Sequence, residues 1–244
     1  MKAFSKKSSY LLIIMMIAAL LLTGTVPSFA AKNKKTYTTP EGTVYPLEKT
    51  TILEGIPEVK GTSAIMIDGG SGRILYEKNA EEPRDPASIT KIITCLLTLE
   101  NMDLNDEVTI THDPVTTGQN IALKKGETLK VKDLLYALML HSSNDAAEVL
   151  AIAVGGDFDT FAEMMNERAK ECGAKNTTFH NPNGLNPDGQ EHNWTTAYDI
   201  SMMAREAMKN PTFRKLVTTT HHKIPATNLS KERKLKTTNP CLGV

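Results

Sequence analysis

Several features that define other classes of protein are scarce in this chain of 244 residues. Aromatic residues make up only 5% of it, and 28 basic side chains are balanced by 28 acidic ones. The composition therefore indicates neither a basic surface nor a set of stacking aromatics, so no nucleic-acid partner is predicted. There is also no internal repeat and no low-complexity tract after the first thirty residues.

Cysteine is rare, and no histidines or cysteines have the spacing of metal ligands. Cys95, Cys172 and Cys241 are too few and too scattered for a disulfide scaffold. Cys95 falls on the apolar face of an expected helix, which predicts a buried thiol. The adjacent His221 and His222 would point in different directions on a regular element and are predicted to lie at the surface.

The first thirty residues have the features of an export signal. Lys2, Lys6 and Lys7 precede an apolar run from Leu11 to Leu22, and small residues then lead to Ala30. This pattern predicts a secretory signal peptide, residues 1–30, cleaved after Ala30. The run is shorter than the roughly 20 residues that cross a bilayer, and an uncleaved anchor is the alternative. No later apolar segment is long enough to span a membrane.

The remaining chain is predicted to contain a polar, extended leader, residues 31–60, and one folded domain, residues 61–244. Turn residues at 69–72 separate two alternating segments, which predicts a β-hairpin. Apolar residues at helical spacing predict five helices, and alternation predicts one more strand. The expected architecture is α+β, a helical cluster packed on a small antiparallel sheet. The expected helices are 88–100, 131–141, one starting after 144, one ending at 172, and 195–209; the expected strands are 62–68, 73–78 and 107–111.

The strongest chemical signal is the pair Ser88 and Lys91 at the start of the helix over 88–100. One helical turn separates them, so both side chains lie on the same face. A serine becomes a good nucleophile when an adjacent base takes its proton, and a lysine is a base only when its surroundings lower its pKa. Taken alone, such a pair is more often a solvated surface pair.

A second candidate is the turn His141-Ser142-Ser143-Asn144 between two expected helices. Ser142 and Asn144 can both point into one cleft, where the hydroxyl relays a proton and the amide binds a carbonyl or a neutral lysine. The alternative is ordinary capping of the following helix by either side chain.

Together these motifs resemble those of the penicillin-recognising serine enzymes. The chain is similar to the low-molecular-weight penicillin-binding proteins, the serine-type D-alanyl-D-alanine carboxypeptidases of the peptidase S11 family. The resemblance covers roughly residues 45–244 and includes the segments AIMIDGGSGRILYEKN, PASITK, HSSNDAAE, NPNGLNPDGQEHNWTTAYDI and KNPTFRKLV. It implies a β-lactamase/transpeptidase-like fold.

The resemblance also implies roles. Ser88 would be the acyl-ester nucleophile, Lys91 the general base, and Ser142 with Asn144 the proton relay and substrate contacts. Asn181–Leu185 and His192–Asp199 would shape the domain without catalysing. The implied reaction removes the terminal D-alanine of a peptidoglycan stem peptide at the outer face of the cytoplasmic membrane or in the cell wall. β-Lactams would acylate the same serine, and no metal or organic cofactor is implied.

The chain departs from the family at its third motif, Lys-Thr-Gly. The nearest string, Lys236-Thr237-Thr238, lacks the glycine, lies in a loop-like context, and precedes the true motif in relatives. We therefore expect a domain truncated before that motif, with an incomplete sheet and without the C-terminal membrane-anchoring helix. Such a product could be an inactive fragment that at most binds peptidoglycan.

Two other enzyme classes use the first motif. A class A β-lactamase also needs a Glu-x-x-x-Asn string in the region after the second motif, and none lies between residues 145 and 200. Position 143 is serine where those enzymes have aspartate. An esterase of this type would have Tyr-x-Asn as its second motif, which is absent.

Overall fold

The computed structural model describes residues 59–115, 117–186, 189 and 191–242, and two short strands nearer the N-terminus. These strands, β1 (Thr36–Thr38) and β2 (Val44–Pro46), pair antiparallel within the predicted leader. The predicted signal peptide lies outside the described residues. None of the described helices is long and apolar enough to cross a membrane.

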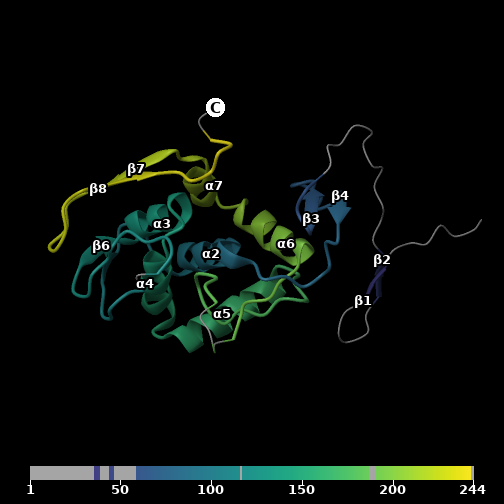
Figure 1. The fold of residues 1–244 in the computed structure, drawn as a ribbon, viewed down its shortest axis with the longest axis horizontal. Helices are drawn as coiled ribbons and strands as arrows, with labels where there is room; N and C mark the ends of the chain where they lie inside the picture. Colours follow the sequence, from purple (N-terminus) through teal and green to yellow (C-terminus); the bar gives the residue numbers. More distant parts are fainter. Residues whose placement is uncertain are drawn as a thin grey trace, which may run out of the picture.

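The predicted hairpin is confirmed as β3 (Ala64–Ile67) and β4 (Ile74–Lys78), which pair antiparallel. Its turn is closed by Asp68, whose Oδ1 accepts hydrogen bonds from the Ser71 amide at 2.7 Å and the Ser71 hydroxyl at 2.6 Å. Arg205 donates to the Gly69 carbonyl at 3.0 Å, which ties the turn to a helix far along the chain. The hairpin stands beside that helix, α6 (Ala197–Ala207), at one end of the molecule (Figure 1).

The predicted helices are all present, and the described part of the chain has one further α-helix that was not predicted. That helix, α7, begins at Pro211, which was interpreted only as a terminator. Proline is tolerated at the first position of a helix, and Asn210 caps α7 by accepting from the amides of Thr212 and Phe213. The helices are α2 (Lys91–Asn101), α3 (Val131–Leu140), α4 (Asn144–Gly155), α5 (Phe158–Glu171), α6 (Ala197–Ala207) and α7 (Pro211–Thr218).

Helix α2 runs through the middle of the molecule, with α3 to α7 around it (Figure 1). Most of its apolar side chains are fully or nearly fully buried, among them Ile93, Leu96 and Leu97. Cys95 is buried on the same helix, as predicted. Because neighbours pack on it from several sides, α2 gives the residues at its N-terminus a rigid support.

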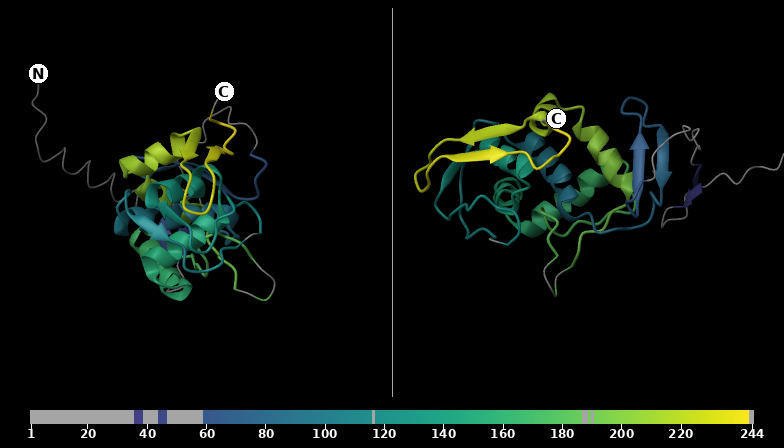
Figure 2. Two further views of the ribbon diagram at one scale, coloured as in Figure 1. Left: turned by 90° about the vertical axis from the view of Figure 1, so that its left-hand side faces the viewer. Right: turned by 45° about the horizontal axis from the view of Figure 1, so that its top comes forward.

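The strands form separate antiparallel pairs in the described part of the chain rather than the one small sheet that was expected. The predicted strand over 107–111 is β5 (Glu107–Thr109), and it pairs with β6 (Thr128–Lys130). A further pair, β7 (His221–Ile224) and β8 (Arg233–Lys236), lies over α3 at the other end of the molecule (Figure 2). The α+β class is confirmed.

Two predictions about this last hairpin were wrong. Lys236 ends a strand instead of lying in a loop. His221 is exposed as predicted, but His222 is half-buried: its Nε2 lies 2.7 Å from Asp133 Oδ1, and its ring stacks on Tyr136 with 3.8 Å between centroids. Strand alternation turns His221 outward and His222 toward α3, which adjacency in the sequence alone could not decide.

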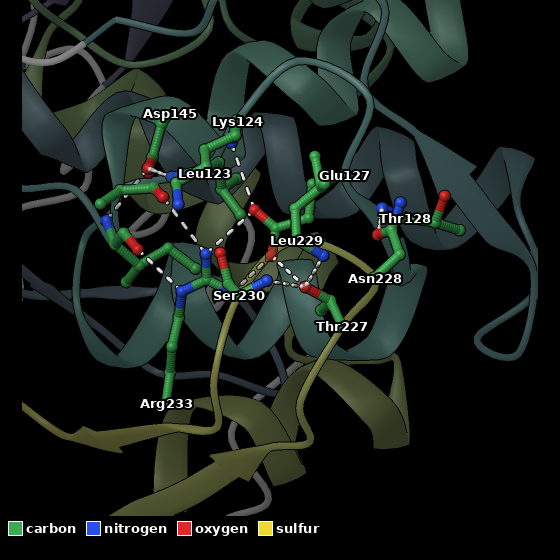
Figure 3. A network of polar contacts seen from close by, with 12 residues as sticks. Leu123, Lys124, Glu127, Thr128, Asp145, Thr227, Asn228, Leu229, Ser230 and Arg233 are labelled. Carbon is green, nitrogen blue, oxygen red and sulfur yellow. Dashed lines mark hydrogen bonds and ion pairs between the residues drawn. The ribbon is translucent and has the colours of Figure 1, made fainter.

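A polar network fixes the β7–β8 hairpin to the rest of the fold (Figure 3). Arg233 donates to both carboxylate oxygens of the fully buried Glu127, at 2.7 and 3.0 Å, and to the Ile121 carbonyl at 2.9 Å. Thr227 donates to the same carboxylate at 2.6 Å. The charge of Glu127 is therefore paired and hydrogen-bonded, as a buried charge requires.

Candidate active site

Ser88 lies in a 3₁₀ turn, η1 (Ala87–Thr90), that leads directly into α2. The predicted helix thus begins three residues later than expected, but the predicted proximity holds, because side chains three apart eclipse in a 3₁₀ turn. Lys91 Nζ lies 3.0 Å from Ser88 Oγ. Ser88 is exposed, whereas Lys91 is only 2% exposed, so the pair is not the solvated surface pair that was the alternative.

Lys91 has two further oxygen partners. Its Nζ donates to Asn144 Oδ1 and to the main-chain carbonyl of Asn183, both at 2.8 Å. Burial lowers the pKa of Lys91 to about 8, from an ordinary value of 10.5. At pH 7 about a tenth of the lysine is then neutral, far more than at its ordinary pKa.

These contacts also orient the neutral amine. The oxygens of Asn144 and Asn183 carry no hydrogen, so each must accept an N–H from Lys91. A neutral amine has two N–H groups and one lone pair. With both N–H groups engaged, the lone pair is left for the Ser88 hydroxyl, which can donate its proton to it.

Asn144 is the first residue of α4, and its side chain lies against Lys91. While its Oδ1 accepts from Lys91, its Nδ2 donates to the Thr117 carbonyl at 3.1 Å. The capping interpretation is wrong, since the cap position is Ser143 and no side chain caps the helix there. The amide of Asn144 is thus held at both ends.

Ser142 lies in the turn before α4 in a left-handed conformation, with a φ of 56°. Such a φ is uncommon for a residue other than glycine. Among the described residues, the hydrogen bonds of Lys91 reach Asn144 and not Ser142. Of the four predicted site residues, the structure therefore joins Ser88, Lys91 and Asn144 directly, whereas Ser142 is half-exposed in the turn before Asn144.

The loop around Asn183 was predicted only to shape the domain, yet its main chain contacts Lys91. A Cβ on Gly184 would lie 1.8 Å from the Ala87 carbonyl, and its φ is 79°. Only glycine fits there, because the loop presses on the turn that carries Ser88. The signal in the sequence was the Asn-Gly pair, but its contact with Lys91, 92 residues away, depends on the tertiary fold.

Helix α4 also holds the segment 115–123 through residues that sequence reasoning missed. The Asp145 carboxylate accepts from the amides of Ile121 and Leu123, both at 3.0 Å. The Glu148 carboxylate accepts from the Val115 amide at 2.8 Å. Both acidic residues lie in the motif segment HSSNDAAE, and their place in that segment was the available signal.

Comparison of the sequence with known protein families identifies the family of this chain. The sequence profile of the peptidase S11 family, described as D-alanyl-D-alanine carboxypeptidase, matches residues 50–243. The chain belongs to this family of serine peptidases.

Individual relatives agree with that assignment. The chain is 39% identical to D-alanyl-D-alanine carboxypeptidase DacF of Bacillus subtilis over 163 residues, which are 64% of this chain and 41% of that protein. It is 33% identical to DacA of Escherichia coli, covering 66% of this chain and 42% of that protein. The chain thus spans about two fifths of the length of these curated relatives.

Solved structures have the same fold. The D-alanyl-D-alanine carboxypeptidase DacD of Francisella tularensis matches with a TM-score of 0.64 and 32% identity, over 71% of this chain and 43% of that chain. A variant of the Streptomyces K15 DD-transpeptidase matches with a TM-score of 0.69 and 30% identity, over 77% of this chain and 78% of that chain. The similarity therefore extends over most of the described fold.

Proposed function

We propose that this chain is a serine-type D-alanyl-D-alanine carboxypeptidase that acts through a Ser88 acyl-enzyme. The observation that carries the proposal is the contact between exposed Ser88 and buried Lys91, at 3.0 Å, with the pKa of the lysine lowered by burial to about 8. Nucleophile and base are within hydrogen-bonding reach, and the base has the acidity that its task requires.

The proposed reaction has two steps. The neutral amine of Lys91 takes the proton of Ser88 as its oxygen attacks the carbonyl between two D-alanines. The bond to the terminal D-alanine then breaks, and the departing nitrogen receives a proton, relayed through the Ser142 hydroxyl. Water next attacks the acyl ester and regenerates Ser88. Asn144 holds Lys91 and binds the substrate carbonyl side.

The substrate, in this proposal, is a peptidoglycan stem peptide, and β-lactams are inhibitors that form a slowly released acyl ester. We also propose that residues 1–30 are a cleaved export signal, 31–60 a leader and 61–244 the peptidase domain. The protein would then act on the outer face of the cytoplasmic membrane or in the cell wall.

The test is labelling of the full chain with a fluorescent penicillin, followed by release of D-alanine from a synthetic peptide ending in D-Ala-D-Ala. We expect stable labelling that Ser88→Ala abolishes. Ser201→Ala is the matched control, because among the described residues that hydroxyl donates to a carbonyl of its own helix, that of Tyr198 at 2.7 Å. It should label like the wild type.

Other outcomes would overturn the proposal. Fast turnover of the penicillin would indicate a class A-like β-lactamase, the alternative enzyme class that shares the first motif. A folded chain that takes no label would indicate a fragment that does not catalyse acylation, and binding to purified peptidoglycan would then show whether it retains a binding function.

A further inference from the structure

Glu148 links the two segments that contact the catalytic residues. It lies on α4, one turn after Asn144, and is half-buried. One carboxylate oxygen accepts from the Val115 amide at 2.8 Å, and the other accepts from Asn183 Nδ2 at 3.4 Å. Val115 and Asn183 come from loops far apart in the sequence, so a single carboxylate ties these loops together.

The Asn183 side of this link leads to Lys91. Asn183 is buried, and its carbonyl oxygen accepts from Lys91 at 2.8 Å. Its side chain is held at both ends, because Nδ2 donates to Glu148 while Oδ1 accepts from the Leu185 amide at 2.8 Å. Fixing the side chain in this way fixes the direction of the carbonyl that orients Lys91.

The Val115 side leads to Asn144. Two residues after Val115, the Thr117 carbonyl accepts from Asn144 Nδ2 at 3.1 Å. That bond determines which end of the Asn144 amide faces Lys91. Glu148 therefore acts on the Asn183 carbonyl through the Asn183 side chain, and on Asn144 through the backbone that carries Val115 and Thr117.

Only an acceptor with two free oxygens can serve here. Both partners of Glu148 donate an N–H, and a glutamine would present one acceptor and one competing NH₂ group. The carboxylate borders a cavity of about 400 Å³. Burial, together with the nearby Asp145, raises the pKa of Glu148, while the Val115 amide lowers it. The other titratable groups on the cavity wall are Asp159 and His180.

We propose that Glu148 is a positioning residue for the reaction, which holds the Asn183 carbonyl and the Asn144 amide so that the lone pair of Lys91 faces Ser88. The inference rests on the proposed function of Lys91 as the base. Glu148 itself touches neither Ser88 nor Lys91 in any hydrogen bond of the described residues.

The test measures the titration of Lys91 in the full chain by NMR of isotope-labelled lysine, with its signal assigned through Lys91→Arg. In Glu148→Gln, the loosened carbonyls admit water, and the midpoint should rise by about one pH unit from its wild-type value near 8. The acylation rate at pH 7 should fall about tenfold through misplacement of the base, with unchanged affinity for penicillin. Glu167→Gln, at an exposed site on α5, is the matched control and should change neither quantity.

A second variant covers a failure of Glu148→Gln to fold. Asn183→Ala removes the donor to Glu148 without adding a charge beside Lys91, and it should raise the same midpoint. A fall in the midpoint of Glu148→Gln would show that Glu148 acts only as a nearby negative charge, and no change would show that it positions nothing. If the wild type took no label, the proposed function would fail, but the titration would still decide the role of Glu148.

Discussion

At the scale of single residues, the site depends on how Lys91 is solvated. Its three oxygen partners replace water, and burial lowers its pKa to about 8. Only the neutral form can take the proton of Ser88, and the neutral fraction of a lysine increases as the pH rises through its pKa. The geometry and the acidity of Lys91 therefore have one cause, its enclosure by Asn144 and Asn183.

This leads to a prediction for the pH dependence of acylation. The rate of labelling by penicillin should increase about tenfold per unit at low pH and level off above a midpoint of about 8. Stopped-flow labelling between pH 6 and 10 measures it, with far-UV circular dichroism at each pH as the control for folding. A rate that does not change over this range would rule out Lys91 as the titrating base.

At the scale of elements, α4 and β8 hold one segment from opposite sides. Asn144, Asp145 and Glu148 on α4 bond its backbone between Val115 and Leu123. Arg233 on β8 bonds its carbonyls at Ile121 and Ala122, at 2.9 and 3.2 Å. The hairpin β7–β8 thus supports the segment whose Thr117 carbonyl contacts Asn144, and Figure 3 shows Arg233 among the residues of the polar network around it.

Removing Arg233 should therefore destabilise the fold. Arg233→Ala leaves the carboxylate of Glu127 buried without its cation, and we expect a loss of about 3–5 kcal/mol in the free energy of unfolding. Urea denaturation at pH 7 measures it. Lys234→Ala, at the exposed neighbouring position of the same strand, is the matched control. Equal stabilities of the two variants would contradict the role assigned to this pair.

The pH dependence of this effect has a definite sign. Burial acts to raise the pKa of Glu127, but hydrogen bonds from Arg233 and Thr227 outweigh it and hold the pKa below its ordinary value. A lowered pKa stabilises the fold above the unfolded-state value, about 4.3 for glutamate, and this contribution is lost as the pH falls through the folded-state value. The difference between wild type and Arg233→Ala should therefore shrink in acid.

At the scale of the whole molecule, the helices enclose α2, and the cysteines report on this enclosure. Cys95 on α2 is fully buried, Cys172 is buried at the end of α5, and Cys241 is exposed. Burial raises the pKa of the Cys95 and Cys172 thiols, and it is the thiolate that reacts.

Thiol titration should thus distinguish the folded from the unfolded chain. In native protein one thiol, that of Cys241, should react quickly with a disulfide reagent, and all three should react in denaturant. Cys241→Ser should remove the fast reaction alone. Equally fast reaction of Cys95 in native protein would show that α2 is not enclosed as described.

The sequence by itself determined the elements whose residues repeat with a clear period. The apolar spacing along 131–140 and 158–171 predicts helices because one face of each must be buried, and the turn at 69–72 predicts the hairpin around it. Ser88 and Lys91 were predictable for the same reason, since a separation of three residues places them on one face whatever surrounds them. The short strands β6, β7 and β8 lack such a period and were missed.

Only the tertiary structure decided what surrounds Lys91. Asn144 lies 53 residues away from it and Asn183 lies 92 residues away, and no local pattern states that their oxygens meet at one nitrogen. Glu148, Asp145 and Arg233 act on loops distant in sequence, through backbone groups that every residue type possesses. Local periodicity reflects burial of one face, whereas the acidity and orientation of a base depend on which distant groups exclude water from it.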